Sequence, residues 1–289
     1  MENYERIIDH LAPIVEKLEL WNIKFSGYFS TATNHSRTVS FAKLKTLNFH
    51  FVAGSQQLLA VLIGHHNCLK ELIISTDESL EPQDREDFFN MIENLFKLNT
   101  KVKHLTLSSS EISKSISSLT MIQLESLKIY LIVDEESNKS AAKFIKAQSH
   151  LKNISINFNF FNSDIFTKIW KSMQGCEIVE LLNVTSNFNS NDLKVKPTIT
   201  NLKVTGELIF INGFFGAIPN LEILRVGRLT DDVITYAAYS LKSLKVIEFA
   251  LENGQVENYN EMKQYENVIN KNIILRHQTV NDFLRGENN

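Results

Sequence analysis

Pro219-Asn220-Leu221-Glu222-Ile223-Leu224-Arg225-Val226 is the stretch that decides the fold. Its core is Leu-x-x-Leu-x-Val, in which apolar residues alternate with a residue that faces the other way, as in a β-strand. The same six-residue pattern recurs along the chain in ten copies, which start at Val15, Leu44, Leu69, Val102, Leu124, Leu151, Val179, Ile199, Leu221 and Leu241. One hexapeptide would be uninformative, but ten in series indicate a repeat protein.

The spacing of the copies resembles that of the leucine-rich repeat family. Successive copies begin 20 to 33 residues apart, and a leucine-rich repeat is about 20 to 29 residues long. A unit of this size is one strand and a return segment, which buries its apolar face only by stacking on its neighbours. The resemblance implies an α/β solenoid, a horseshoe with about ten or eleven parallel strands on its concave face and helices on its convex face.

The whole chain, residues 1–289, is predicted to be a single leucine-rich repeat domain. Residues 1–13 are predicted to be an N-terminal helical cap, and residues 14–250 are the repeats. Residues 251–281 are predicted to be a C-terminal cap, which contains an irregular eleventh strand, and residues 282–289 to be a loose tail.

Four return segments are predicted to be helical, and the first of them is capped by Ser55 and contains Leu58, Leu59, Leu62 and Ile63. The longest begins near Pro82, a residue favoured in the first turn of a helix. Its apolar stripe consists of Phe88, Phe89, Ile92, Leu95 and Phe96. The other two helices are predicted at Ser140–Gln148 and Ser163–Met173, and the eleventh strand at Ile273–Leu275. An amphipathic stripe of this kind is expected to pack on the sheet.

Composition narrows the classes of function. The net charge is −3 and 43% of the residues are apolar, which argues against nucleic acid or an anionic membrane as a partner. The chain has two cysteines, Cys68 and Cys176, as expected in a reducing compartment. No signal-peptide or membrane-spanning pattern is present, so we expect a cytoplasmic protein, with a nuclear location also compatible.

The sequence contains no motif for catalysis or cofactor binding. Phosphate-binding glycine loops, nucleophile elbows and Cys-x-x-Cys pairs are all missing. The pair His65-His66 has no cysteine or carboxylate at ligand spacing, so it does not predict a metal site. We therefore expect a protein that is not an enzyme and that has no cofactor and no metal.

Residues between the buried ones are expected to face the concave wall and to bind a protein partner. The candidates are Trp21, His50, Ile73, Lys128, Tyr130, Lys203, Arg225 and Lys245. Lys203, Arg225 and Lys245 hold the same position in three consecutive copies, which predicts a basic row without a compensating acid. One interpretation is a solvated face; the other is a groove for an acidic peptide. In the second case, reversing the charge of Arg225 and Lys245 would weaken binding without lowering the thermal midpoint.

The variable period, the helical returns and the phrase Pro219–Leu224 are similar to the repeat halves of F-box proteins. The resemblance implies a non-catalytic protein-binding module, the substrate-recognition half of an F-box type ubiquitin-ligase adaptor, with the ligase scaffold as a further partner. No Leu-Pro-x-Glu type F-box precedes the repeats. An alternative is an extracellular or signalling leucine-rich repeat receptor domain, although the cysteine-rich caps usual there are missing. A third, a GTPase-activating repeat protein, would have a more regular period.

Overall fold

The structure of the chain is a computed structural model. The residues that it describes are 10–21, 41–51, 68–76, 82–108, 123–131, 135–158, 163–184, 193–206, 212–227, 233, 237, 240–251 and 273–279. Some predictions fall outside these residues. They concern the start of the N-terminal cap, His65-His66, most of the C-terminal cap between residues 252 and 272, and the tail 282–289.

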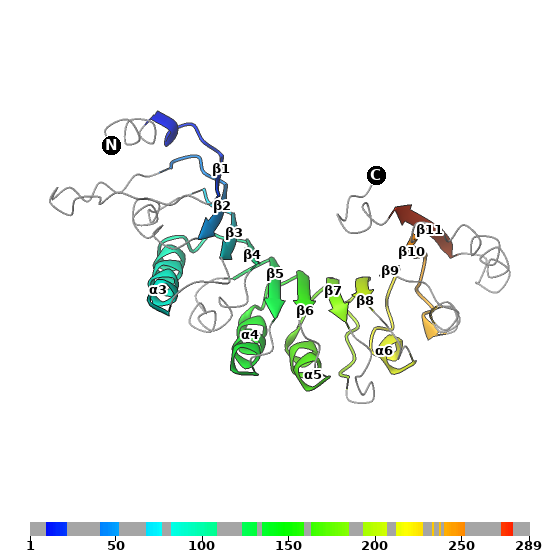
Figure 1. Cartoon of the computed structure of the whole chain (residues 1–289). Coiled ribbons are helices and arrows are strands. Elements are labelled where there is room, and N and C mark those ends of the chain that lie inside the picture. Colours follow the sequence, from blue (N-terminus) through cyan, green and yellow to red (C-terminus); the bar gives the residue numbers. More distant parts are fainter. Residues whose placement is uncertain are drawn as a thin grey trace. The chain divides into compact units, whose positions relative to one another are not determined.

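The strands form one open sheet of 11 parallel strands whose order along the sheet is their order in the sequence (Figure 1). Their bounds are β1 Lys17–Leu20, β2 Thr46–Phe51, β3 Glu71–Thr76, β4 His104–Leu107, β5 Ser126–Leu131, β6 Asn153–Phe158, β7 Ile178–Val184, β8 Asn201–Gly206, β9 Ile223–Val226, β10 Val246–Leu251 and β11 Ile274–Thr279. Each predicted strand is confirmed, and β11 is longer and more regular than predicted.

Four helices are described, α3 (Pro82–Leu98), α4 (Glu135–Ala147), α5 (Ser163–Ser172) and the short α6 (Asn212–Gly216). The helices predicted near Pro82, Ser140 and Ser163 are confirmed, although α4 begins five residues before the predicted start at Ser140. The helix predicted after Ser55 lies outside the described residues. The chain divides into two compact units. Unit 1 comprises residues 1–130 and 136–151, and unit 2 comprises residues 131–135 and 152–289. Each unit is described by itself below.

Within each unit, a recurring backbone contact joins successive repeats. We number the hexapeptide from 1 to 6, so that its apolar residues hold positions 1, 4 and 6, and the residue after it holds position 7. The carbonyl oxygen at position 2 accepts hydrogen bonds from the amides at positions 2 and 3 of the following repeat. Glu16 O, for example, accepts from Lys45 N at 2.7 Å and from Thr46 N at 3.1 Å. The same double contact recurs in both units, for example from Glu222 and Ile223 to Thr200 O, and it fixes the register of the repeats.

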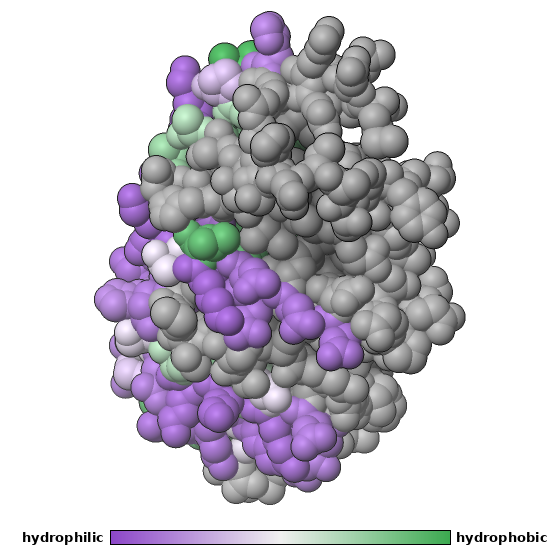
Figure 2. Space-filling view, turned by 90° about the vertical axis from the view of Figure 1, so that its left-hand side faces the viewer, coloured by the Kyte–Doolittle hydropathy of each residue, from purple (hydrophilic) through white to green (hydrophobic). Residues whose placement is uncertain are grey.

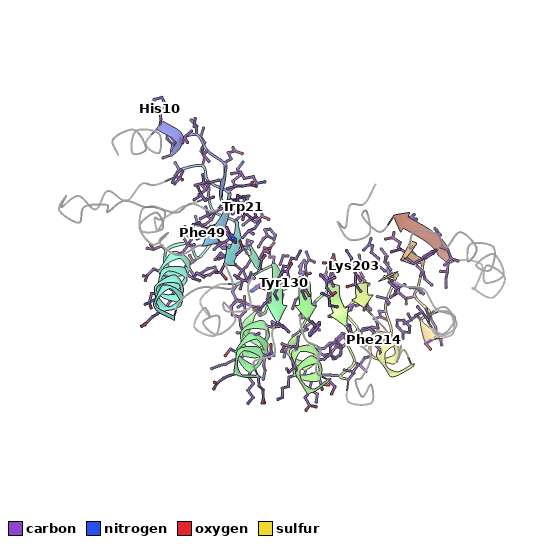
Figure 3. All side chains as sticks on the ribbon, viewed as in Figure 1. His10, Trp21, Phe49, Tyr130, Lys203 and Phe214 are labelled. Atoms are coloured by element: carbon purple, nitrogen blue, oxygen red, sulfur yellow. The ribbon has the colours of Figure 1, made fainter. Side chains whose placement is uncertain are left out.

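One face of the strands, the core face, carries the apolar side chains. In β3, β5 and β6 buried and half-buried residues alternate strictly, as expected for strands with one buried face. In unit 2 the core face packs against aromatic residues of the helices. Phe158 of β6 lies 5.9 Å from Phe166 of α5, and Trp170 of α5 lies 5.2 Å from Phe214 of α6, measured between ring centroids. Figure 3 shows Phe214 on the helix side of the strands and Lys203 on the other side, the opposite face.

The predicted register is wrong by three residues in the seventh repeat. Val179 was assigned to position 1, but it pairs with Ile154 and Leu202, which both hold position 4. Position 1 therefore belongs to Cys176, which is buried. The apolar pattern misleads here because β7 contains a bulge between Leu181 and Val184, which adds apolar residues beyond position 6.

The tenth repeat is displaced in the same way. Ile247 pairs with Leu224 at position 4, so the repeat begins at Leu244 and not at Leu241. Leu241 lies in the turn that precedes the repeat, where the amide of Leu244 donates to its carbonyl oxygen at 3.2 Å. Leu241 is also buried, and this extra apolar residue three positions earlier produces a false copy of the hexapeptide.

The bulge in β7 has a specific backbone requirement in β8. Asn183 adopts a left-handed conformation with φ of 58°, which asparagine tolerates better than most residues. Gly206, which pairs with Val184 across the sheet, has φ of 105°. A Cβ atom at Gly206 would lie 2.2 Å from the carbonyl oxygen of Val184. Glycine is therefore required at position 206 by both conformation and space.

We predict that Leu127→Ala and Leu224→Ala each destabilise the protein by about 2–5 kcal/mol. Both side chains hold position 4 and are at most 1% exposed, so their truncation leaves cavities in the core. Urea denaturation followed by circular dichroism measures the change. Unfolding midpoints equal to wild type in both variants would contradict the assignment of these leucines to the core.

We predict that Gly206→Ala destabilises the protein more than Gly175→Ala does. Gly175 also has a positive φ, 74°, but no atom lies within 4 Å of a Cβ placed there. The control therefore carries only the conformational cost of about 1–2 kcal/mol, whereas Gly206→Ala adds the collision with Val184. Denaturant midpoints of the two variants give the comparison, and equal midpoints would show that β8 can move away from the bulge.

Candidate binding surface

The opposite face of the strands carries the residues at positions 3, 5 and 7. The five candidate residues in unit 1, Trp21, His50, Ile73, Lys128 and Tyr130, all occupy positions 5 or 7 and are exposed or half-buried. The pairing of β1 with β2, β2 with β3, β3 with β4 and β4 with β5 places position 5 of each repeat beside position 5 of the next. The structure thus puts these five residues on one face of unit 1.

Trp21 and His50 form an aromatic pair at one end of this face. Their ring centroids are 5.7 Å apart and their planes differ by only 14°. On its other side His50 is held by a hydrogen bond of 2.7 Å between its Nδ1 and the hydroxyl oxygen of Ser75. The Trp21 side chain remains 56% exposed. A large aromatic ring is therefore fixed in orientation while most of its surface is available for contact.

The middle of the unit 1 face is polar and carries few charges. Ile73 pairs with Asn48 on one side and Thr106 on the other, and Lys128 pairs with Thr106. At position 3 the hydroxyl of Thr46 donates to the carboxylate of Glu71 at 3.0 Å. This face accordingly offers one exposed aromatic pair, one half-buried apolar residue and the half-buried Lys128.

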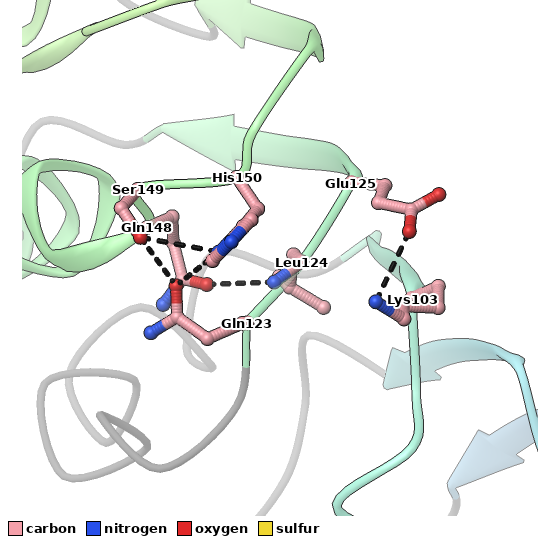
Figure 4. Close-up of polar contacts among 7 residues, drawn as sticks. All are labelled: Lys103, Gln123, Leu124, Glu125, Gln148, Ser149 and His150. Atoms are coloured by element: carbon pink, nitrogen blue, oxygen red, sulfur yellow. Dashed lines mark hydrogen bonds and ion pairs between the residues drawn. The ribbon is translucent and has the colours of Figure 1, made fainter.

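Polar contacts between successive repeats lie close to the residues at which the repeats begin (Figure 4). Lys103 Nζ lies 3.0 Å from a carboxylate oxygen of Glu125. The backbone amide of Leu124 donates to the buried side-chain oxygen of Gln148 at 2.9 Å. These contacts hold β5 in register with the turn that follows α4, so the positions of Lys128 and Tyr130 are set by the scaffold.

In unit 2 the row at position 5 is not basic. It consists of Ser155, Glu180, Lys203, Arg225, Glu248 and Arg276, each paired with the next across neighbouring strands. Acidic and basic residues therefore share the row. The predicted basic row of Lys203, Arg225 and Lys245 without a compensating acid is wrong, because the register error removed Glu180 and Glu248 from the row and introduced Lys245.

Glu248 is the centre of a partly buried charge cluster. Its side chain is 5% exposed and lies 2.5 Å from Nε of Arg225, whose side chain is 17% exposed, and 3.6 Å from Nη1 of Arg276. Arg225 also donates from Nη1 to the side-chain oxygen of Asn201 at 2.8 Å. The guanidinium of Arg225 is thus committed to contacts within the sheet, and Lys203 is itself buried.

Lys245 holds position 2, away from the row. Its Nζ lies 2.8 Å from a carboxylate oxygen of Glu222, at position 2 of the preceding repeat, and both side chains are well exposed. The same kind of pair joins Lys45 to Glu16 at 2.8 Å in unit 1. Lysine or glutamate occupies position 2 in nine of the ten repeats, but the displaced register also puts Glu180 and Lys242 at that position, so this signal could not have corrected the register.

Sequence reasoning also missed an apolar row at position 3 of unit 2. Its members are Ile178, Ile223, Val246 and Ile274, with Asn201 between the first two. Ile178 and Ile274, at its two ends, are exposed, while Ile223 and Val246 are half-buried. The row lies beside the charge cluster, so the opposite face of unit 2 combines aliphatic side chains with charges that are already paired.

Among the residues that the structure describes, Cys176 and Lys196 are the two buried titratable groups with shifted pKa values. Burial raises the pKa of the Cys176 thiol to about 11, so the thiol stays protonated near neutral pH and is a poor nucleophile. Burial also lowers the pKa of Lys196, and neighbouring Lys194 lowers it further. The Lys196 ammonium group donates a hydrogen bond to the carbonyl oxygen of Met173. Both residues fill positions in the repeat core, which accounts for their burial.

Two searches within the described part of the chain gave no candidate. None of its side-chain clusters has the three or more His, Cys, Asp or Glu residues that a metal ion needs. Among its helices, none combines the length and the hydrophobicity that crossing a bilayer requires.

We predict that the pair Arg225–Glu248 contributes far more to stability than the exposed pair Glu222–Lys245. Removing one member of a buried ion pair costs about 3–5 kcal/mol because the other charge stays buried without compensation. An exposed pair contributes about 0–1 kcal/mol. Alanine double-mutant cycles on the two pairs, measured by urea denaturation, give the coupling energies. Equal coupling energies would mean that the charge cluster is solvated.

Comparison with known proteins adds no identification: no family model matches the chain, and no curated protein matches it.

Proposed function

We propose that the protein is a non-catalytic protein-binding module whose partner binds the opposite face of unit 1. The observation that carries this proposal is Trp21, a tryptophan that is 56% exposed and yet held flat against His50. Tryptophan dominates the binding energy of many protein interfaces, because it offers a large contact area at a small cost in side-chain entropy.

The neighbours of Trp21 suit a protein or peptide ligand. Ile73 provides an apolar contact near the middle of the face, and Lys128 and Tyr130 provide a cation and a phenol hydroxyl on β5. An apolar centre flanked by polar groups is typical of a protein interface. Because Lys128 is a cation, an acidic group in the partner is its favoured counterpart. The acidic peptide expected from the sequence is therefore still proposed, but its site is on unit 1 instead of unit 2.

The opposite face of unit 2 is the weaker candidate for the same partner. Arg225 is bound to Glu248 and Asn201, and Lys203 is buried. A ligand carboxylate would have to compete with contacts that are already made within the sheet. The cations of unit 2 are therefore proposed to stabilise the sheet instead of binding the acidic partner.

The family to which the fold belongs is also part of the proposal. We propose a leucine-rich repeat solenoid with the opposite face on its concave side and helices on its convex side. The ten hexapeptides, the parallel strands and the double backbone contact between repeats support it. Within that family we propose the substrate-recognition half of an F-box type ubiquitin-ligase adaptor, acting in the cytoplasm or nucleus. A pull-down from cell extract, probed for the F-box partner and the ligase scaffold, tests this last step, and their absence would overturn it.

We predict that Trp21→Ala strongly weakens peptide binding at the unit 1 face without unfolding the protein. Peptides selected from a random display library on the wild-type protein serve as probes, and their affinities are measured by calorimetry. Loss of an aromatic hot spot costs about 2 kcal/mol or more, which corresponds to a decrease in affinity of about thirtyfold. Ile178→Ser, on the opposite face of unit 2, is the matched control and should leave the affinity unchanged.

The converse result would move the site. If the selected peptides bind Trp21→Ala as tightly as wild type and lose affinity with Ile178→Ser, the apolar row of unit 2 is the binding surface. If none of the selected peptides binds at Trp21, the proposal that unit 1 binds an extended segment is wrong.

A further inference from the structure

We propose that the protein associates with copies of itself through the two end strands of its sheet, so that β11 of one molecule pairs in parallel with β1 of the next. This inference does not rest on the proposed partner binding. The strand order places β1 and β11 at the two ends of the sheet. Each pairs with one neighbour, and no other strand in the described part of the chain pairs with the second edge. Strand edges of this kind are templates for pairing with another chain.

Core positions are incompletely covered at both ends. In β2 to β10 the residue at position 4 is never more than 2% exposed. The residues at the same position in the end strands, Leu18 and Leu275, are half-buried, and so is Leu20 at position 6 of β1. Ile14, which precedes β1, and Ile274, the first residue of β11, are 61% and 52% exposed. Another repeat stacked on either end would cover these side chains, as each inner repeat covers its neighbour.

The backbone supplies the matching groups. In eight repeats the carbonyl at position 2 accepts from two amides of the next repeat, and the carbonyl of Lys245 accepts from the amide of Ile274. The equivalent carbonyl at the end of the sheet belongs to Ile273. The equivalent donors in the first repeat are the amides of Glu16 and Lys17, and no earlier repeat lies in the described part of the chain to accept them. A second copy placed one repeat beyond β11 would bring these donors to Ile273.

Charge complementarity identifies the occupant. Continuing the register of β10 with β11 into β1 of a second copy places Glu19 beside Arg276, both at position 5. Neighbouring strands are about 4.8 Å apart, and opposite charges facing one another across strands are stabilising. Arg276 would then lie between Glu248 of its own chain and Glu19 of the second copy. Both side chains are accessible, because Arg276 is 58% exposed and Glu19 is 44% exposed.

The remaining position on this face also fits. The same register places Lys17 opposite Ile274, and the aliphatic stem of a lysine can cover an isoleucine while its ammonium group stays in water. In the face drawn in Figure 2, hydrophilic residues make up most of the coloured surface. Backbone pairing and the Glu19–Arg276 contact are therefore expected to provide most of the specificity.

The contact joins two different surfaces, so it does not close on itself in a dimer. Each added molecule again presents its end strands β1 and β11, and a contact of this type builds open chains of copies. Self-association is thus expected to increase continuously with protein concentration, without a single preferred oligomer.

Sedimentation velocity of the full chain, across a wide range of concentrations, tests the proposal. The weight-average mass of the wild type should rise above the 33.1 kDa of one chain. Glu19→Arg and Arg276→Glu, each tested alone, should remain monomeric, because each brings like charges together at the contact. Mixing the two variants should restore association, because the two substituted side chains then carry opposite charges where they meet. Lys168→Glu on α5, an exposed residue away from both ends, should associate like wild type.

Circular dichroism of each variant shows whether the variant is folded, so that a loss of association can be distinguished from unfolding. Arg276→Glu also weakens the contact of β11 with Glu248, whereas Glu19→Arg alters only the exposed pair with Lys17. Loss of association in folded Glu19→Arg therefore supports the proposal without relying on the other variant. A wild type that stays monomeric at every concentration, or single variants that associate as wild type does, would overturn it.

Discussion

The double hydrogen bond at position 2 is the contact on which the rest of the structure depends. In eight repeats one carbonyl oxygen, such as Glu16 O or Thr200 O, accepts hydrogen bonds from two amides of the next repeat. This contact sets the register between repeats regardless of how long the return segment is, because it involves only the residues at the start of each strand. Once the register is set, the residues at the same hexapeptide position lie side by side in a row across the sheet. The residues of one row therefore share similar burial and can pair their charges with one another.

The strands could be predicted because their apolar residues alternate, and alternation survives variation in every other feature. The register could not be predicted as reliably. An apolar residue in a turn, Leu241, and a bulge after Leu181 each produced a hexapeptide displaced by three residues. Alternation reports only that a side chain is buried, and a turn residue can be buried as completely as a strand residue. The pairing partners of Ile247 and Val179 are far away in sequence, and only the structure identifies them.

The same limit explains the outcome for the candidate surface. Five of the eight candidates lie on the face of unit 1 because the register is right there. In unit 2 the displaced register replaced Glu248 by Lys245 and concealed an acid that neutralises Arg225. Composition had suggested no such cluster, since a net charge of −3 is compatible with many arrangements. Charge pairing between strands depends on register more strictly than burial does, because a displacement of three residues exchanges a partly buried acid for an exposed base.

The opposite faces of the two units therefore differ in how well they tolerate amino-acid substitutions. In unit 2 a substitution at Arg225 or Glu248 leaves a charge with little access to water, and its cost in stability is large. In unit 1 the corresponding positions hold Asn48, Ile73 and Thr106, and replacing any of them leaves no buried charge behind. A surface that must adapt to a partner requires positions of the second kind. The fixed charge cluster of unit 2 and the adaptable face of unit 1 follow from one backbone scheme, because that scheme constrains the start of each strand and leaves positions 5 and 7 open.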